Sequence, residues 1–433
     1  MAKTEVIVMA GIAFSVGLLL GLVVHLPGVS SPLKRGDGGK AGHPSIEADI
    51  RRLVSARFPG TGTDNVTGRL TGNQRPGIDL FHRTRFGPAG VSAGGNYTDT
   101  RRNATHWNET SGSDDTVFSR IIVDGVFWSN EIEAMAPDRF SDADVARWRR
   151  KTEAARVVTL DAGCGMMQNR HLVFDDATHA CARYRINADQ IQGDVFSFYL
   201  SRLLGVGHVP PAVLATTKRR RHLWSGVDSQ LVAAQWSSGR AFVLTPWVPG
   251  LEPAFIPPDL RRDNRTLHPT PAAMENKTHG ELVELLQWSD LIVFDYLTAN
   301  VDRVVNNMFN KQWNDHMMDS PTHNLERSAP SGLLVFLDNE SGLFHSYRLL
   351  DKYAHYHDSL LGSLCVFRRQ TALRVQTLYR DGDVGTKLVE LFENHEPLHS
   401  EIPTIPAENM QMLHRRLGDV HRQILKCQRT FHS

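Results

Sequence analysis

The spacing of apolar residues changes near residue 248, and this change constrains the fold more than any other feature. Before it, short apolar runs bounded by turn residues predict strands at 121–128, 155–160, 170–174, 179–185 and 241–247. After it, apolar residues recur at helical spacing in 281–298 and in the stretch containing Leu413, Leu417, Val420 and Ile424. Strands followed by helices predict an α+β protein with two lobes, a β-rich one at about 116–247 and a helical one at about 248–433.

Two further elements are predicted within these lobes. Residues 192–204 carry Val195, Phe198, Tyr199 and Leu203 at three- and four-residue steps, which predicts a helix inside the β-rich lobe. The apolar run 333–337 predicts a covered strand inside the helical lobe. The helix at 281–298 is apolar over much of its circumference, so it is expected to be buried.

Composition describes an ordinary folded chain and excludes some classes of protein. Of 433 residues, 41% are hydrophobic and 22% charged, which excludes wholesale disorder. Lysine and arginine number 48 against 47 acidic residues, so the net charge is +1 and no nucleic-acid partner is expected. The four cysteines form no C-x-x-C pair that would indicate structural zinc.

The amino-terminal end predicts a membrane anchor. Residues 6–26 contain no acidic, lysine or arginine side chain, and about 20 residues of helix span a hydrocarbon core. This length favours a signal anchor preceded by a cytoplasmic tail at 1–5. The alternative is a cleaved signal peptide, whose apolar stretch is usually only about 7–15 residues long. Flanking charge does not fix the orientation, because Lys3 lies on one side and Lys34 and Arg35 lie on the other.

Glycosylation sequons decide the orientation instead. Residues 27–115 are rich in Gly, Ser, Thr, Asn and Arg and predict a flexible stem. The N-x-[ST] pattern occurs at Asn65, Asn96, Asn103, Asn108, Asn264 and Asn276. A short cytoplasmic tail, one span and a large lumenal part therefore follow, giving a single-pass type II protein. Chance matches are the alternative explanation for any single sequon.

All four cysteines, Cys164, Cys181, Cys365 and Cys427, fall in the predicted lumenal part. An oxidising lumen permits two disulfide bonds. Bonds Cys164–Cys181 and Cys365–Cys427 would each close one sequence neighbourhood. Four cysteines allow three pairings, and four buried free thiols are the alternative.

Two acidic clusters indicate phosphoryl-transfer chemistry. Asp302 and Asn307 follow the buried helix with the D-x-x-x-x-N spacing of a kinase catalytic loop, and Asp338-Asn-Glu follows the strand at 333–337. Phosphoryl transfer needs a carboxylate near the attacking hydroxyl and oxygen ligands for a cation. Each motif alone is weak, because Asp302 could pair with a neighbouring arginine and the triplet could form a turn. Their order after a strand-rich half is more specific.

The two clusters lie in longer motifs that resemble a known family. Trp288-Ser-Asp-Leu-Ile-Val-Phe-Asp-Tyr-Leu-Thr-Ala-Asn-Val-Asp-Arg303 and Leu334-Val-Phe-Leu-Asp-Asn-Glu-Ser-Gly-Leu343 are similar to the Four-jointed family of Golgi atypical protein kinases. Asn187-Ala-Asp-Gln-Ile-Gln-Gly193 is similar too. The likeness extends over roughly residues 120–430 and implies an atypical protein-kinase-like fold.

The resemblance implies roles for several residues. Asp302 would be the catalytic base, and Asp338 would hold a divalent cation, Mn²⁺ or alternatively Mg²⁺, that accompanies ATP. Asn307 has the spacing of a second cation ligand, although related secretory kinases carry Glu there. Glu340 replaces the glycine of the usual triplet, and its role is open, with a solvated carboxylate as the alternative. Asn339 begins a sequon that we predict to be unoccupied, because a glycan would block the site.

The β-rich lobe departs from ordinary kinases in its cofactor-binding residues. Arg183 or Arg185 replaces the usual strand lysine, and Asp194 replaces the usual helix glutamate. Gly163 and Gly165 would form the turn over the nucleotide, although the full G-x-G-x-x-G pattern is absent. Arginine is not geometrically interchangeable with lysine, so a pseudokinase without nucleotide binding is an alternative.

The resemblance also implies substrates and a compartment. Its members transfer ATP phosphate to Ser or Thr in the extracellular cadherin repeats of Fat and Dachsous cadherins, which tunes the binding of these partners in planar cell polarity and growth control. It implies residence in the Golgi membrane, with possible release of a secreted form.

Two other classes of function compete with the kinase hypothesis. A lumenal glycosyltransferase would use Asp142-Ala-Asp144 as a metal-binding D-x-D motif, although Ser141 at a polar helix start favours a helix cap there. A non-catalytic cadherin-binding protein would use the kinase fold as a scaffold.

Overall fold

The computed structural model describes residues 114–219 and 221–431, all within the unit Tyr97–Ser433. Within these ranges no helix combines the length and apolarity needed to cross a membrane. The predicted tail and span, and the stem up to residue 113, lie outside the described residues, as do Asn65, Asn96, Asn103 and Asn108. These predictions stay predictions.

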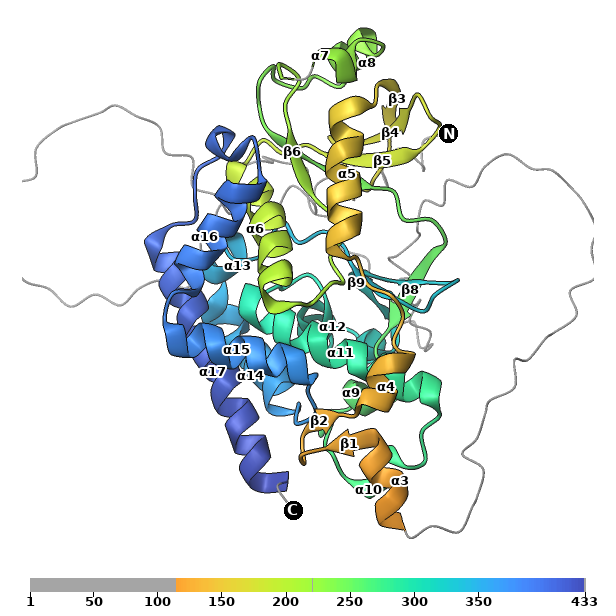
Figure 1. Cartoon of the computed structure of the whole chain (residues 1–433), viewed down its shortest axis with the longest axis vertical. Coiled ribbons are helices and arrows are strands. Elements are labelled where there is room, and N and C mark those ends of the chain that lie inside the picture. The colour runs from red at the N-terminus through yellow and green to blue at the C-terminus, as the bar shows by residue number, and fades with distance from the viewer. Residues whose placement is uncertain (1–113, 220, 432–433) are drawn as a thin grey trace, which may run out of the picture. The chain divides into compact units, whose positions relative to one another are not determined.

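The described ranges contain both strands and helices (Figure 1). The strands are β1 (Ile122–Val123), β2 (Phe127–Trp128), β3 (Val157–Ala162), β4 (Arg170–Phe174), β5 (His179–Arg183), β6 (Val213–Ala215), β7 (Phe242–Pro246), β8 (Leu251–Phe255), β9 (Pro321–Ser328) and β10 (Leu334–Phe336). The helices before residue 262 are α3 (Asp114–Ile121), α4 (Asn130–Met135), α5 (Asp142–Ala154), α6 (Ala188–Leu204), α7 (Arg221–Trp224), α8 (Asp228–Ala233) and α9 (Pro258–Arg261). The later ones are α10 (Pro271–Met274), α11 (His279–Thr298), α12 (Val304–Asn310), η1 (Asp315–Asp319), α13 (His345–Arg348), α14 (Leu350–Gly362), α15 (Arg369–Asp381), α16 (Val384–His395), η2 (His399–Glu401) and α17 (Ala407–Phe431).

A five-stranded antiparallel sheet forms the first half, in the order β3-β4-β5-β7-β6. Helix α5 packs on it through Trp148, whose indole N–H donates to the carbonyl of Leu244 at 3.1 Å. Trp148 also meets Phe174 edge to face, with ring centroids 6.1 Å apart. Burying such aromatic rings stabilises a sheet whose strands are short. The strands predicted at 155–160, 170–174, 179–185 and 241–247 are therefore confirmed, with shifted ends.

The prediction for 121–128 is wrong in part. Helix α3 ends at Ile121, and only two short strands follow, β1 and β2, which pair through Ile122 with Trp128 and Val123 with Phe127. The apolar density there serves burial: Ile121, Val126 and Trp128 are all almost completely inaccessible. Dense apolar sequence marks burial without distinguishing a helix end from a strand.

The second half is mainly helical, as predicted. Helix α11 begins with a capping box in which Thr278 and Glu281 exchange hydrogen bonds, and it is buried along most of its length. A smaller antiparallel sheet, β10-β9-β8, lies beside it and includes the predicted strand at 333–337. The mixed α+β architecture expected from the sequence is therefore confirmed.

Two disulfide bonds cross-link this framework. Cys164 pairs with Cys181, and Cys365 pairs with Cys427. The first joins the β3–β4 turn to β5, and the second joins the segment after α14 to α17. Of the three possible pairings, the structure therefore has the one in which each bond closes a single sequence neighbourhood.

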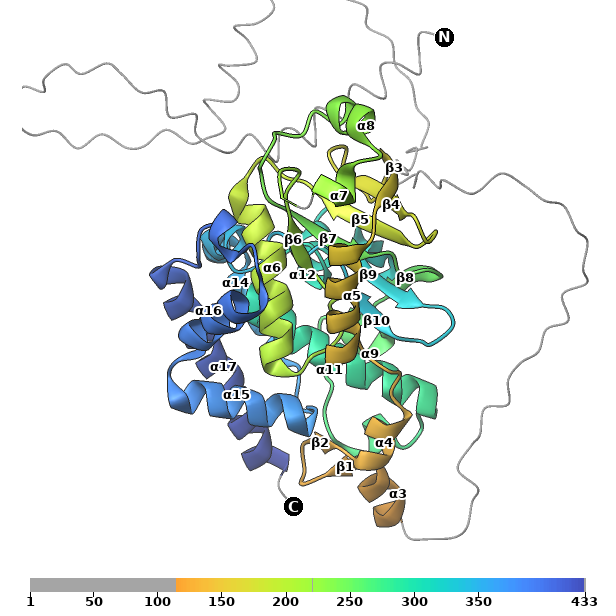
Figure 2. The same cartoon turned by 45° about the horizontal axis from the view of Figure 1, so that its top comes forward.

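Helix α6 lies between the larger sheet and helices α15 and α16 (Figures 1 and 2). It approaches the segment after β10 at Gly193, where an added Cβ would lie 2.1 Å from the carbonyl oxygen and 2.7 Å from the carbonyl carbon of Glu340. Backbone atoms cannot move aside as a flexible side chain can. A glycine at 193 is therefore a condition for the observed position of α6.

We predict that Gly193→Ala destabilises the protein by about 3 kcal/mol, because overpacking against backbone forces α6 away. An alanine in an uncrowded helix has the opposite effect, a gain of about 0.5–1 kcal/mol. Gly280→Ala on α11 is the matched control, because its added Cβ would meet only the Thr278 hydroxyl at 4.0 Å. Urea denaturation of both variants measures the two changes. Equal or greater stability of Gly193→Ala would contradict the close approach.

Candidate functional site

Arg183, the last residue of β5, forms the centre of a buried cluster of charged side chains. Its Nε donates to Asp194 Oδ2 on α6 at 2.6 Å. Its Nη2 donates to Asp338, and Glu340 lies 3.4 Å from the same nitrogen. The side chain is only 11% exposed. One guanidinium therefore connects the sheet, α6 and the segment that follows β10.

The carboxylate of Asp194 has a second hydrogen bond. Its Oδ1 accepts from the backbone N–H of Asn339 at 3.0 Å, while Oδ2 accepts from Arg183. The close approach at Gly193 places Asp194 opposite this backbone N–H. Asp194 therefore fixes both the cation of β5 and the backbone of the Asp338-Asn339-Glu340 triplet.

Arg185 shares Glu340 with Arg183 and adds a contact of its own. It donates to Glu340 through Nε and to the Asn169 side chain through Nη1. Asn169 in turn donates to the carbonyl of Cys164 at 2.6 Å, in the β3–β4 turn. Gln190 Nε2 completes the surroundings of Glu340 by donating to its Oε1 at 2.9 Å. The sequence left Arg183 and Arg185 as alternatives for the ion pair with Asp194, and Arg183 is the residue that makes it.

The predicted nucleotide-covering turn is linked to this cluster. Gly165 has φ +88°, a conformation that other residues rarely adopt, and an added Cβ at Gly163 would lie 2.9 Å from the Cβ of His171. The Cys164–Cys181 disulfide bond and the Asn169 hydrogen bond hold the turn between these glycines. A path of contacts therefore runs from the turn through Asn169 and Arg185 to Glu340.

Asp302 lies in the loop between α11 and α12. Its backbone N–H donates to Asn300 Oδ1 at 2.9 Å, which shapes the loop. Burial raises the pKa of the Asp302 carboxyl, and the nearby charge of Asp338 raises it further. The charge of Asp338 therefore acts on Asp302, which lies in a different loop.

Arg303 holds the Asp302 loop against the triplet. It is completely buried, and its guanidinium pairs with Asp295 on α11. The same side chain donates to the carbonyls of Asn324 at 3.1 Å and Leu337 at 2.8 Å, and to Asn339 Oδ1 at 2.5 Å. The alternative in which Asp302 merely pairs with its neighbour is thus not the arrangement observed. Arg303 instead forms its ion pair with Asp295.

Asn307 lies apart from these contacts. It is buried on α12, and its Nδ2 donates to the carbonyls of Met317 at 2.8 Å and Ser320 at 3.3 Å. Its Oδ1 is buried without a hydrogen-bond partner in the described part of the chain. An oxygen in this state is chemically suited to a cation, and the structure gives no contact between Asn307 and Asp338.

The cluster contains more negative than positive charge. Asp194, Asp338 and Glu340 face only two guanidiniums, those of Arg183 and Arg185. Burial opposes ionisation of Asp338, but the two arginines outweigh it and lower the pKa of that carboxyl. Burial and the charge of Asp338 raise the pKa of Glu340 to about 7, and burial raises the pKa of Asp194. The excess negative charge therefore contributes to the raised pKa of Glu340.

This charge imbalance is what a cation site requires. Oxygen ligands with excess negative charge suit Mg²⁺ or Mn²⁺. Asp338 also has φ +50°, a strained conformation of the kind that recurs at functional sites. Over the described ranges, no three Asp, Glu, His or Cys side chains converge as a formed metal site. The carboxylate oxygens are of a type that binds such cations, but in the arrangement observed they do not converge on one point, and Arg183 contacts Asp338.

Sequence reasoning missed several members of the site. Asn169, Gln190, Asp295 and Arg303 have side chains that hold the cluster, and Gly193 allows α6 to approach. Gln190 and Gly193 lie within one family-like motif, and Asp295 and Arg303 within another, so these motifs were the available signal. No local pattern marks Asn169, because its partner Arg185 is 16 residues away.

The competing D-x-D motif is a helix cap. Ser141 Oγ accepts from the backbone N–H of Asp144 at 3.2 Å, and Asp144 Oδ2 accepts from the backbone N–H of Ser141 at 2.9 Å. Asp142 is 94% exposed and pairs with Arg202. The predicted cap is confirmed, and the motif on which the glycosyltransferase alternative depended has a structural role.

Three sequons lie within the described residues. Asn264 and Asn276 are exposed, so their accessibility is compatible with the predicted glycosylation. Asn339 is buried, and its Nδ2 donates to the carbonyl of Phe336 at 3.0 Å, which is compatible with the predicted absence of a glycan. Glycosylation itself remains a prediction at all of these positions.

A strand arginine paired with a helix aspartate, beside two loop carboxylates, is the arrangement that the kinase-like prediction describes. Residues 143–430 match the Four-jointed box protein middle domain, and the chain belongs to the Four-jointed box protein family. It is 42% identical over 310 residues to Four-jointed box protein 1 of Xiphophorus maculatus, covering 72% of each chain. The human protein of that name is 42% identical over 335 residues, covering 76% of each chain. The predicted family is thus confirmed.

Two further similarities concern kinases. The extracellular serine/threonine protein kinase four-jointed of Drosophila melanogaster is 40% identical over 357 residues, covering 71% of this chain and 61% of that one. A crystal structure of the Golgi casein kinase with Mn/ADP bound aligns with 66% of this chain and 77% of its own. Its sequence identity is 13% and its TM-score 0.43, which is too low to establish a shared fold.

The raised pKa of Glu340 predicts a pH dependence of stability. Folding raises this pKa from 4.5 to about 7, so the folded protein binds the proton more tightly than the unfolded chain. The free energy of unfolding should therefore fall as the pH rises from about 4.5 to about 7. We predict that Glu340→Gln removes about 3 kcal/mol of this fall.

Guanidinium denaturation at pH 5 and pH 8 measures the effect. Glu393→Gln, on the exposed side of α16, is the matched control and should leave the fall as in the unaltered chain. The same fall in Glu340→Gln and in the unaltered chain would show that Glu340 does not bear the excess charge.

Proposed function

We propose that this chain is an ATP-dependent protein kinase that phosphorylates Ser or Thr hydroxyls. The observation that supports it best is the buried ion pair between Arg183 of β5 and Asp194 of α6, which lies close to Asp338 and to the loop of Asp302. Membership of the Four-jointed box protein family and the name of the Drosophila relative point the same way.

Asp302 is proposed as the catalytic base. A base works best when its pKa lies near the operating pH, and burial raises the pKa of Asp302 towards that range. Its carboxylate would accept the proton of the attacking hydroxyl. Arg303 positions the loop through contacts with Asp295 and the backbone of Leu337, so the base is held by buried groups.

Arg183 is proposed to bind phosphate oxygens of ATP, with the Gly163–Gly165 turn beside the nucleotide. Arginine presents a planar fork of donors that matches phosphate geometry. Asp338, together with Glu340 or Asn307, would hold Mn²⁺ or Mg²⁺. When bound, that cation would neutralise phosphate charge.

The compartment and partners are also proposals. Two disulfide bonds support an oxidising compartment for the described residues. We propose a Golgi membrane protein anchored by residues 6–26, with the kinase-like part in the lumen and release of a secreted form by cleavage. The proposed substrates are cadherin repeats of the Fat and Dachsous type, whose mutual binding phosphorylation would tune.

A non-catalytic cadherin-binding function is the second candidate. The ion pair between Arg183 and Asp338 favours it, because it engages the carboxylate that a cation would need. A scaffold of this kind would bind the cadherin without transferring phosphate.

We predict that the purified full-length chain, with Mn²⁺ and labelled ATP, transfers phosphate to Ser or Thr of a folded cadherin repeat. Asp302→Asn should lower the rate at least about 100-fold, because it removes the base. Asp338→Asn should abolish cation-dependent transfer. Mass spectrometry of the cadherin identifies the modified residues.

Asp142→Asn is the matched control, because it alters an exposed aspartate of the former D-x-D motif and should leave the rate unchanged. A parallel incubation with sugar nucleotides tests the remaining enzyme class. Sugar incorporation that Asp142→Asn abolishes would overturn the kinase proposal. Cadherin binding without transfer of either group would support the scaffold.

A further inference from the structure

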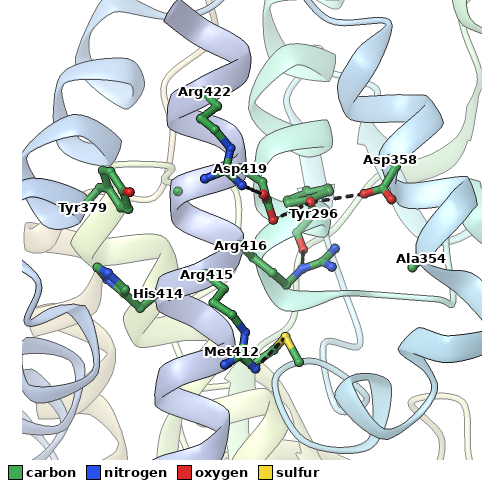
Figure 3. A pocket seen from close by; sticks show the side chains of 11 residues that line it. Tyr296, Ala354, Asp358, Tyr379, Met412, His414, Arg415, Arg416, Asp419 and Arg422 are labelled. Carbon is green, nitrogen blue, oxygen red and sulfur yellow. Dashed lines mark hydrogen bonds and ion pairs between the residues drawn. The ribbon is translucent and has the colours of Figure 1, made fainter.

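The helical half contains a pocket of about 400 Å³ whose residues take no part in the site around Arg183. Its walls come from α11, α14, α15 and α17 (Figure 3). Helix α17 contributes most of the charged lining, in the stretch from His414 to Arg422. The Cys365–Cys427 disulfide bond anchors the carboxyl-terminal end of this helix.

Arg416 is the unusual member of this lining. Only 5% of the residue is exposed, and its Nε donates to the backbone carbonyl of Tyr296 at 2.6 Å. Its guanidinium carbon lies 3.9 Å from the centroid of the Tyr296 ring. In the described part of the chain, its Nη2 has no hydrogen-bond partner, and no carboxylate lies within ion-pair distance of the group. Asp358 and Asp419 attract this charge without forming an ion pair, and burial still lowers the pKa of the guanidinium, so a bound anion would stabilise it further.

Two neighbours on α17 add donors at the same place. His414 Nδ1 is buried and has no hydrogen-bond partner within the described ranges. Arg415 is exposed, and its only recorded partner there is the sulfur of Met412, at 3.7 Å. All three side chains line the pocket, His414 on the side of Tyr379, Arg415 beside Met412 and Arg416 beside Tyr296 (Figure 3). Neither arginine is paired with a carboxylate within the described ranges.

Two carboxylates line the same pocket and act on the charge of Arg416. Asp358 and Asp419 both lie within hydrogen-bond distance of the Tyr296 hydroxyl, at 3.2 Å and 3.0 Å, and Asp419 also pairs with Arg422 (Figure 3). These charges repel an anion, so they would weaken its binding without preventing contact with Arg415 and Arg416. Removing one of these carboxylates should therefore strengthen the binding of an anion in the pocket. Nonspecific attraction of salt ions to the protein would not show this effect.

A second hollow of about 350 Å³ shares His414 and Arg415 with the pocket. Its other walls are the turn between α15 and α16, at Gly382–Thr386, and Met410 and Gln411 of α17. Two hollows therefore lie against the same pair of side chains, His414 and Arg415. A group that carries the anion has room there.

We propose that this pocket binds an oxyanion of the phosphoryl or sulfo type. Arg416 would contribute the buried charge, and Arg415 and His414 the further donors. Guanidinium groups bind such oxyanions through several hydrogen bonds at once. The site is independent of phosphoryl transfer, because none of its residues belongs to the cluster around Arg183 or the loop of Asp302.

The test titrates the purified full-length chain with inorganic phosphate and with sulfate, at an ionic strength kept constant with chloride. Calorimetric titration and thermal unfolding follow binding. The expected result is saturable binding that Arg415→Gln weakens about tenfold, since a hydrogen bond between charged groups is lost. Asp358→Asn should tighten it about threefold or more, since a repelling charge is removed.

Arg429→Gln on the same helix is the matched control, because Arg429 is exposed and does not line the pocket. Arg416→Gln should abolish binding. If that variant fails to fold, Arg415→Gln and Asp358→Asn still decide the outcome. No saturable binding, or binding that neither of these two substitutions changes, would overturn the proposal. Tighter binding of a phosphoserine peptide than of phosphate would identify a protein-borne group as the source, and equal affinity a free anion.

Discussion

The ion pairs of Arg183 are the interaction on which the site depends. One guanidinium on β5 contacts Asp194 of α6 and Asp338 of the segment after β10, so three parts of the chain meet at one buried group. Breaking one partner of a buried charge network leaves an uncompensated charge, which costs several kcal/mol. The position of α6 relative to the sheet is therefore coupled to the electrostatics of the site.

Two residues outside the Arg183 cluster, Gly193 and Arg303, make this arrangement possible. Gly193 lets the backbone of α6 touch the carbonyl of Glu340, so Asp194 reaches both Arg183 and the backbone of Asn339. Arg303, completely buried, binds the carbonyl of Leu337 and pairs with Asp295. Steric contact thus fixes one side of the triplet and hydrogen bonding fixes the other.

Much of the fold was predictable from sequence because it depends on local periodicity. The strands of the larger sheet and the buried helix α11 follow from apolar spacing, and the cap at Ser141 follows from a known local motif. The structure of residues 121–128 was not predicted correctly, because the buried apolar residues there belong to a helix end and a short hairpin. Periodicity reports burial more reliably than it reports the element that is buried.

The site was predictable only where a motif extended beyond local spacing. Arg183 and Asp338 are separated by 155 positions, and no periodicity relates residues that far apart. The D-x-x-x-x-N spacing and the acidic triplet pointed to Asp302 and Asp338, and the resemblance to the Four-jointed family gave them roles and added Asp194. It did not supply Asn169, whose role arises from a side-chain contact with Arg185 that forms only once the sheet has folded.

The substitution of arginine for the usual strand lysine has a consequence that the geometry makes clear. Nε of Arg183 donates to Asp194, while Nη2 donates to Asp338 and lies near Glu340. Separate donors of one rigid guanidinium therefore reach separate carboxylates. A lysine ammonium is a point charge on a flexible stem and lacks this fixed divergence of donors. Arginine is longer than lysine and aspartate is shorter than glutamate, so the contact between Arg183 and Asp194 is compatible with the predicted replacement of both residues. Arginine and aspartate at these two positions therefore form a matched pair.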